Sequence, residues 1–294
     1  MTLLRSNPVA ASVLFDAPGP RALRRNRIFS AVTVACILLI TGVVVHQLSA
    51  KGQLAYEKWE PFTTANLWRT YVLPGVVGTL TAAAISIVLA MILGLVLAVG
   101  RMAPARWVRW VSGIIVEVLR AIPVLIMMIF AYFLYALYDV FPSGQLALAG
   151  VVTGLTLYNG AVIAEILRSG VAALPRGQNE AAHALGLRWN QTMRFILLPQ
   201  SIGAMSPVLV SQLVVALKDS AIGYQITFVE MVRQGTVIGS TYGNYVPALM
   251  VIAVLMIALN FALSAGANRL RRQLHQSRRV GTLASTTAPA QPAA

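Results

Sequence analysis

Two pairs of opposite charges interrupt the apolar stretches of this sequence. Glu117 and Arg120 are three residues apart, as are Glu165 and Arg168, and residues at this spacing share one face of a helix. Ionisable groups inside apolar spans are costly and often functional. We expect either two structural ion pairs that anchor helices, or charges that line an inner gate and change partners when the gate moves.

Lys218, Asp219 and Ser220 form another polar site within an apolar stretch. Adjacent helix residues point about 100° apart, so Lys218 and Asp219 cannot share one face. All three residues are candidates for contact with a solute pathway. In that case one of the two charged side chains would face the solute, and the other would pair with a neighbouring helix. The alternative is that Lys218 extends to the nearer lipid headgroups.

The residue types needed for catalysis or metal binding are sparse. The histidines, His46, His183 and His275, are far apart, and Cys36 is the single cysteine, so neither a metal site nor an intrachain disulfide is expected. None of the lysines follows the Gly-rich turn that cradles nucleotide phosphates. The sequence therefore predicts that the chain is not an enzyme, has no ATPase site and holds no cofactor.

Long uncharged stretches alternate with short basic segments. Only 11% of the residues are charged and 57% are apolar, whereas soluble domains carry roughly 25% charged residues. A helical span needs about 20 apolar residues, and six stretches qualify. They are approximately residues 28–48, 75–99, 111–137, 146–167, 202–222 and 246–267. The expected fold class is all-α, a polytopic membrane protein with six transmembrane helices, the third of which is kinked by Pro123.

The basic residues gather on one side of this six-span arrangement. The N-terminal segment, the connections after the second and fourth spans, and the C-terminal segment hold most of the 23 Lys and Arg residues. The other side holds Lys51, Lys58, Arg69 and Arg233. Because positive loops stay in the cytoplasm, both termini are predicted to be cytoplasmic. The net charge of +14 then favours membrane lipids with anionic headgroups as partners, and not nucleic acid.

The chain divides into four expected parts. Residues 1–27 form a basic cytoplasmic arm, and residues 28–48 form an additional N-terminal span. Residues 74–269 form the main transmembrane domain, including a cytoplasmic loop at residues 169–201. Residues 270–294 form a cytoplasmic tail that lacks anything to pack and is expected to be disordered.

The loop at residues 169–201 carries the densest pattern. Its marked positions are Glu180, Ala181, Ala182, Gly186, Leu187, Ile196 and Pro199. We predict a short helix over residues 179–185, ended by Gly186 in the left-handed conformation with Leu187 as the apolar contact of the cap. A second helix is expected over residues 189–197, ending before Pro199. Ala181, Ala182 and Leu185 would form one small apolar face that another protein can approach closely.

The same pattern resembles the cytoplasmic signature of bacterial ABC importer permeases. The signature is Glu180-Ala181-Ala182, three residues, Gly186, nine residues, Ile196, one residue and Leu198-Pro199, and every position is matched. Flanking segments such as Gly78-Thr79-Leu80 and Leu217-Lys218-Asp219-Ser220 look like the polar amino-acid branch. The resemblance covers roughly residues 74–269. The additional N-terminal span departs from it, since many members of that branch have five spans.

This resemblance implies a set of partners. Two permease chains, the same or related, form the pathway in the bacterial inner membrane, two ABC ATPase subunits bind beneath them, and an extracytoplasmic substrate-binding protein delivers the solute. The loop at residues 169–201 would be the coupling helix that docks on the ATPase, where ATP and magnesium act. Glu180, Ala181, Ala182 and Gly186 match the docking positions.

The resemblance also bears on the substrate. Residues 15–20 and 57–62 look like the glutamate-uptake permeases of Gram-positive bacteria, so we favour glutamate, with glutamine or a basic amino acid as alternatives. Lys218 would attract a carboxylate in a desolvated site, whereas Asp219 would suit a basic substrate, and the binding protein could set the selectivity instead. A rival interpretation, an ion-coupled secondary transporter, predicts inverted repeats, and the sequence shows no convincing repeat beyond the short Glu-x-x-Arg echo.

Overall fold

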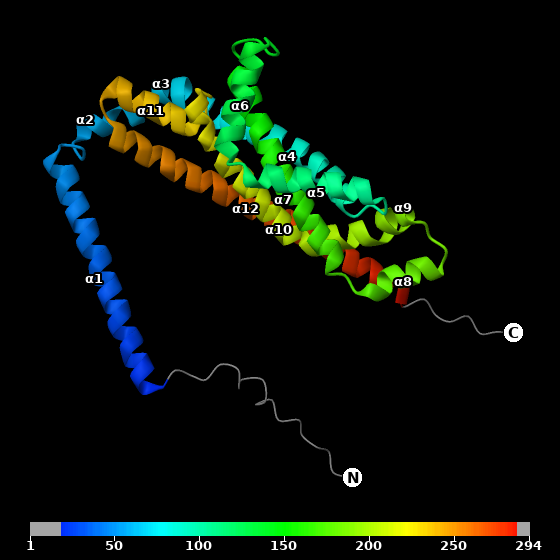
Figure 1. Cartoon of the computed structure of the whole chain (residues 1–294). Coiled ribbons are helices and arrows are strands. Elements are labelled where there is room, and N and C mark those ends of the chain that lie inside the picture. The colour runs from blue at the N-terminus through cyan, green and yellow to red at the C-terminus, as the bar shows by residue number, and fades with distance from the viewer. Residues whose placement is uncertain (1–18, 287–294) are drawn as a thin grey trace. The chain divides into compact units, whose positions relative to one another are not determined.

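The described part of the chain is helical throughout. A computed structural model describes residues 19–286, with side chains described for residues 19 and 21–266 and for Arg269. Within these residues the regular elements are all helices, as the sequence predicts (Figure 1). The chain divides into two units, Met1–Lys58 and Trp59–Ala294.

The first unit contains one long helix, α1 (Pro20–Ala50), which is long and apolar enough to cross a membrane. Its apolar side chains are exposed on all sides and none of its described residues is buried, which suits a helix surrounded by lipid. Proline is favoured at the first helical position, and α1 begins at Pro20, so Arg21 and Arg27 of the predicted arm are helical. The rest of the arm, residues 1–18, lies outside the described residues.

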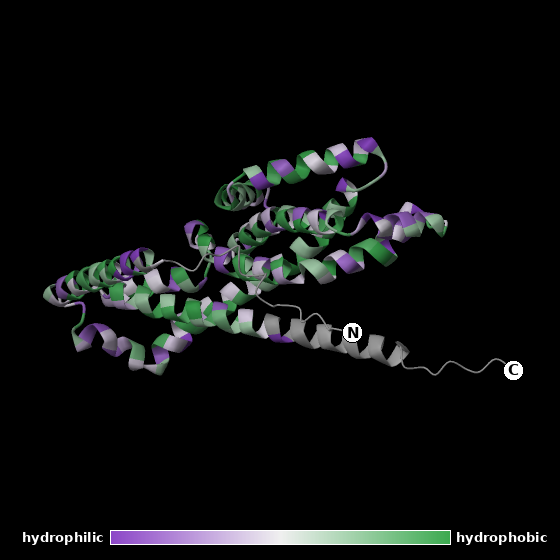
Figure 2. Cartoon of the chain, turned by 90° about the horizontal axis from the view of Figure 1, so that it is seen from below, coloured by the Kyte–Doolittle hydropathy of each residue, from purple (hydrophilic) through white to green (hydrophobic). Residues whose placement is uncertain are grey.

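The second unit holds the remaining helices. They are α3 (Ala65–Leu67), α4 (Leu73–Arg101), α5 (Arg106–Ala121), α6 (Val124–Leu137), α7 (Leu146–Ala172), α8 (Arg176–Ala184), α9 (Trp189–Thr192), α10 (Leu198–Asp219), α11 (Met231–Tyr242) and α12 (Tyr245–Thr286), while α2 (Tyr56–Trp59) lies at the boundary between the units. The continuous segments Ala65–Arg101, Leu146–Ala172, Trp189–Ile226 and Tyr245–Gly266 are candidate spans. These helices are predominantly hydrophobic along their lengths (Figure 2).

The third predicted span is not one kinked helix, which corrects the prediction for residues 111–137. It is broken into α5 and α6, which are bent by 99° relative to each other. Ile122 and Pro123 are both extended at the break, because proline removes a backbone donor and disfavours the helical conformation of the residue before it. The 14 residues of α6 reach only about 21 Å. Residues 19–286 thus contain five candidate spans, or six if the bent pair counts as one.

The helices α4 and α7 form the centre of the second unit and share its most extensive contact. Each presents a row of buried small residues to the other helices. These residues are Gly75, Ala82, Ala83, Ser86, Ala90, Gly94 and Ala98 on α4, and Gly150, Gly154, Gly160, Ala161, Ala164 and Gly170 on α7. Small side chains allow helix backbones to approach closely in a membrane, where packing rather than hydrophobicity drives association.

The C-terminal helix extends further than expected. The predicted span at residues 246–267 lies within α12, which continues to Thr286. The tail was predicted to be disordered from residue 270. The helix α12 instead continues beyond its apolar portion, so the tail is helical up to residue 286. Residues 287–294 lie outside the described residues.

A close contact joins the start of α4 to the turn before α11. A Cβ on Gly78 would overlap the carbonyl oxygen of Val229, and the Thr79 hydroxyl accepts the backbone N–H of Met231 at 3.2 Å. The fully buried Glu230 caps α11 by accepting the backbone N–H groups of Val232 and Arg233. Burial raises the pKa of Glu230 to about 7, although these two N–H groups act in the opposite direction.

We expect Gly78→Ala to destabilise the protein by about 1–3 kcal/mol, because the added methyl group must displace backbone atoms. The matched control is Gly113→Ala on α5, where a Cβ meets nothing within 4 Å, and this change should stabilise by up to about 1 kcal/mol. Thermal unfolding of the purified chain in detergent measures both variants. Equal melting temperatures for Gly78→Ala and the wild type would contradict the close contact.

Candidate functional site

Arg101, the last residue of α4, joins the two charge pairs recognised in the sequence. Its guanidinium Nη1 donates to Glu165 Oε2 on α7 at 2.7 Å and to Glu117 Oε1 on α5 at 3.3 Å. Glu165 also accepts hydrogen bonds from Arg168 Nε at 3.0 Å and 3.2 Å. Arg120 lies 3.7 Å from Glu117. Three helices are thus connected by one charge network, defined as Arg101, Glu117, Arg120, Glu165 and Arg168.

The links of this network differ in strength. The Arg101 and Glu165 side chains are 17% and 25% exposed, whereas Glu117 is 61% exposed. Exposed pairs contribute little because water screens them, whereas a shielded carboxylate depends more strongly on its cations. The contacts of Glu165 with Arg101 and Arg168 are therefore the central links, and the Glu117–Arg120 pair is peripheral.

The network lies beside the predicted coupling loop. Arg168 precedes the end of α7 by one turn, and α8 follows after a short connection. The Ser201 hydroxyl at the start of α10 donates to the carbonyl of Leu167 at 3.1 Å. The helices α8 and α9 lie at one end of the second unit, and α3 and α11 lie at the opposite end (Figure 1). Arg168 is thus separated from α8 only by the last turn of α7 and the connection at residues 173–175.

The end of α8 has the capping geometry that the sequence predicts. Gly186 has a φ of +73°, its N–H donates to the carbonyl of His183 at 2.9 Å, and the N–H of Leu187 donates to the carbonyl of Ala182 at 3.1 Å. These two bonds make a Schellman cap. The helix spans Arg176–Ala184, so it begins three residues earlier than the predicted residue 179 and ends one residue sooner than residue 185.

The three residues of the predicted apolar face of α8 differ in exposure. Ala182 is buried against the protein, whereas Ala181 and Leu185 are exposed, Leu185 by 78%. At about 100° per residue, Leu185 lies between Ala181 and Ala182 around the helix axis, so the three residues do occupy one side of α8. They differ in exposure because the protein covers only Ala182, while Glu180, Ala181 and Leu185 are exposed.

The second helix of the loop does not end before Pro199, which corrects that prediction. The helix α9 continues through a π-helical turn, Met193–Leu197, directly into α10. Proline is tolerated in the first turn of a helix, and the wider turn before it rearranges the backbone hydrogen bonds that Pro199 cannot make. Ile196 lies within this turn and is partly buried, so the loop is rigidly joined to the next span.

The three polar residues at the end of α10 are not brought together on one surface. Lys218 is exposed and Asp219 is partly buried, as expected for neighbours on a helix. Ser220 is buried, and its hydroxyl donates to the carbonyl of Leu217 at 2.7 Å. Within the described part of the chain, neither Lys218 nor Asp219 makes an ion pair with a third residue.

Sequence reasoning missed two features. Arg101 belongs to the basic connection after the second span, and its position at the very end of an apolar span is a signal that it could pair with a carboxylate on another helix. The buried Asn159 of α7 accepts a hydrogen bond from Gln212 of α10 at 2.7 Å and donates to the carbonyl of Leu155 at 2.9 Å. A polar residue in the middle of an apolar span was the signal for this second contact.

We expect Arg101→Gln to lower stability by about 1–3 kcal/mol, because Glu165 loses a well-shielded charged partner. The matched control is Arg120→Gln, which removes the same charge from the peripheral pair and should cost less than about 1 kcal/mol. Melting temperatures of the purified variants measure both effects. A larger loss for Arg120→Gln would show that Arg101 is not the centre of the network.

Comparison with known proteins gives a consistent family. Residues 87–276 match the family described as "Binding-protein-dependent transport system inner membrane component". The glutamate transport system permease protein GluD of Corynebacterium glutamicum is 53% identical over 231 residues, which cover 79% of this chain and 85% of that protein. The glutamate/aspartate import permease protein GltK of Escherichia coli O157:H7 is 28% identical, and the match covers 69% of this chain and 93% of that protein. Relatives from Bacillus subtilis are named for glutamine and arginine transport.

A solved structure agrees with these relatives. The crystal structure of an amino acid ABC transporter with histidines contains a chain that is 27% identical, with a TM-score of 0.64, and the match covers 73% of this chain and 97% of that one. The family resemblance read from residues 180–199 is confirmed by the match over residues 87–276. This chain belongs to the binding-protein-dependent inner-membrane components, the multi-pass permease subunits of ABC transporters, which are not themselves catalytic.

Proposed function

We propose that this permease subunit imports glutamate. The observation that carries the proposal is the 53% identity over 231 residues with a C. glutamicum protein named for glutamate transport. Identity to the relatives named for glutamine and arginine is lower and covers less of this chain. Glutamine or a basic amino acid remains the alternative substrate in the same architecture.

We infer that transport is driven by ATP bound with magnesium at a partner ATPase, and that α8 docks on that partner. The helix is exposed except at Ala182, so its surface is available. Its exposed surface carries an acidic residue, Glu180, as well as the apolar Ala181 and Leu185, which suits a mixed protein interface. The Schellman cap at Gly186 fixes the direction in which this surface points.

The orientation follows from the distribution of charge. The end of the second unit that carries α8 and α9 would face the cytoplasm, because the connections at this end carry most of the basic residues. The opposite end, with α3 and α11, would receive solute from an extracytoplasmic binding protein. A second permease chain, the same or related, would complete the pathway.

We infer that the charge network holds α4, α5 and α7 together near the cytoplasmic end and changes its ion-pair partners when the gate moves. It links α4, α5 and α7 through partly exposed charges that can exchange partners without being fully desolvated. Fixed anchoring of the helices is the simpler role for the same contacts. Among the pathway candidates, Lys218 and Asp219 retain free charged groups, whereas the Ser220 hydroxyl is used within its own helix.

We expect Glu180→Lys and Gly186→Val to abolish most uptake while the chain still inserts into the membrane. The first change reverses a charge on the docking face, and the second places a β-branched residue at positive φ, at a cost of about 1–2 kcal/mol. Glu57→Lys, the same reversal on exposed α2, is the control and should transport normally. Wild-type uptake in both loop variants would refute docking through α8.

In cells without a redundant importer, we expect deletion of the gene to abolish uptake of labelled glutamate and to reduce uptake of glutamine or arginine less. Restoration with Lys218→Met should leave uptake reduced about tenfold, the effect of losing one charged contact, whereas Lys51→Met should restore it fully. Unchanged glutamate uptake after deletion would refute the substrate. Full restoration by Lys218→Met would refute only the role of Lys218.

A further inference from the structure

We propose that the first turns of α5 bind the headgroup of an anionic phospholipid. The proposal concerns a groove on one face of α5 with a volume of about 700 Å³. The groove is lined by Arg106, Arg109, Trp110, Ile114, Glu117 and Val118, together with Gly113. The proposal of a lipid site does not depend on which amino acid the permease carries.

The charged end of the groove has cations without counter-charges. The Arg106 side chain is exposed and forms no hydrogen bond or ion pair among the residues whose side chains are described, which are 19, 21–266 and 269. Arg109 uses one nitrogen, Nη1, to donate to the carbonyl of Ala103 at 3.0 Å, which orients its guanidinium and leaves its other donors available. The first turn of α5 contains no acidic residue. Paired guanidinium groups of this kind match the oxygens of a phosphate.

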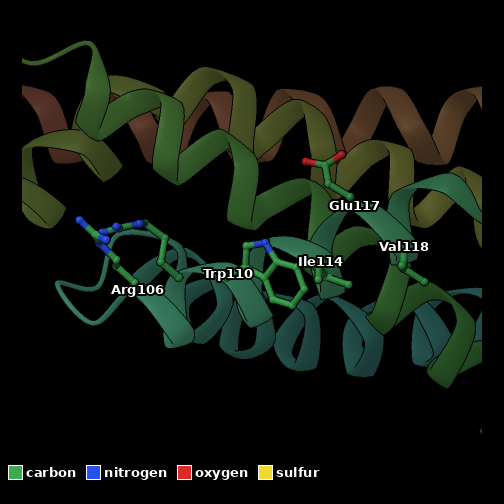
Figure 3. A pocket seen from close by; sticks show the side chains of 7 residues that line it. Arg106, Trp110, Ile114, Glu117 and Val118 are labelled. Carbon is green, nitrogen blue, oxygen red and sulfur yellow. The ribbon is translucent and has the colours of Figure 1, made fainter.

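Further along α5 the lining becomes amphipathic and then apolar. Trp110 of the lining is 71% exposed, and exposed tryptophan is typical of the boundary between headgroups and acyl chains. Ile114 and Val118 follow on the groove face and are also exposed. In Figure 3, Arg106, Trp110, Ile114 and Val118 succeed one another along the helix. This order of cation, indole and aliphatic side chains matches the order of groups in a phospholipid.

Glu117 limits where the phosphate can lie. In Figure 3 its carboxylate points away from Ile114 and Val118, and it is paired with Arg101 and Arg120. A second negative charge beside it is unfavourable, so the phosphate is confined to Arg106 and Arg109. Because Glu117 also belongs to the charge network, the bound lipid would lie next to the link between α5 and α4.

The location also favours a lipid. The groove begins just after Arg101, which contacts Glu165 near the end of α7, so it lies at the same end of the unit as α8. Basic pockets at the cytoplasmic ends of membrane helices commonly bind anionic headgroups. A second permease chain is the competing occupant, and it would have to leave two arginines without acidic partners or supply them.

Native mass spectrometry of the purified full chain, titrated with phosphatidylglycerol, tests the charged end. Phosphatidylcholine with the same acyl chains is the zwitterionic reference. We expect Arg106→Gln to weaken phosphatidylglycerol binding about fivefold and to leave phosphatidylcholine binding unchanged. The control Arg176→Gln removes an exposed cation from α8 and should change neither. The proposal would be overturned if the wild type showed no preference for phosphatidylglycerol. It would also be overturned if Arg106→Gln and Arg176→Gln weakened phosphatidylglycerol binding equally.

A photo-crosslinking side chain at position 110 tests the occupant directly, and it leaves both arginines in place. In membranes that contain phosphatidylglycerol, we expect a lipid adduct that Arg106→Gln reduces. A crosslink to a second copy of this chain or to another protein, in place of the lipid, would overturn the proposal and identify the groove as a protein interface.

Discussion

The close packing of α4 against α7 is the constraint on which the other functional features depend. Gly94 and Gly160 let the two backbones approach closely, since a Cβ on Gly94 would lie 2.9 Å from the carbonyl oxygen of Gly160, and this approach places the end of α4 beside the last turns of α7. Arg101 can then reach Glu165 at 2.7 Å. At the other end of α4, the same small-residue surface allows the turn before α11 to rest on Gly78 and Thr79.

The break at Ile122 and Pro123 is the second determinant. It separates α5 from α6 by 99°, so α5 packs on α4 and α7 as an independent helix. Glu117 is thereby directed to Arg101, while Arg106 and Trp110 are exposed on the groove. The charge network and the proposed lipid site therefore share a single structural cause.

Predictions that rest on local backbone preferences agree best with the structure. The end of α8 at Gly186 follows from the glycine itself, since few other residues accept a φ of +73°. Predictions that depend on neighbours agree less well. Whether Ala181 or Ala182 is buried depends on what packs against α8. The continuation of α9 past Pro199 depends on a π-helical turn, which no residue type in the sequence predicts.

Hydropathy and short motifs are encoded within a few consecutive residues, and they were enough to predict the membrane setting, the approximate spans, the signature at Glu180–Pro199 and the family. Which charges pair with one another depends on the packed helices. Arg101 and Glu165 are 64 residues apart, and Glu165 could equally have been satisfied by Arg168 alone. The choice of partners depends on the crossing of helices that are distant in sequence, and that crossing is set by the summed packing of many small side chains.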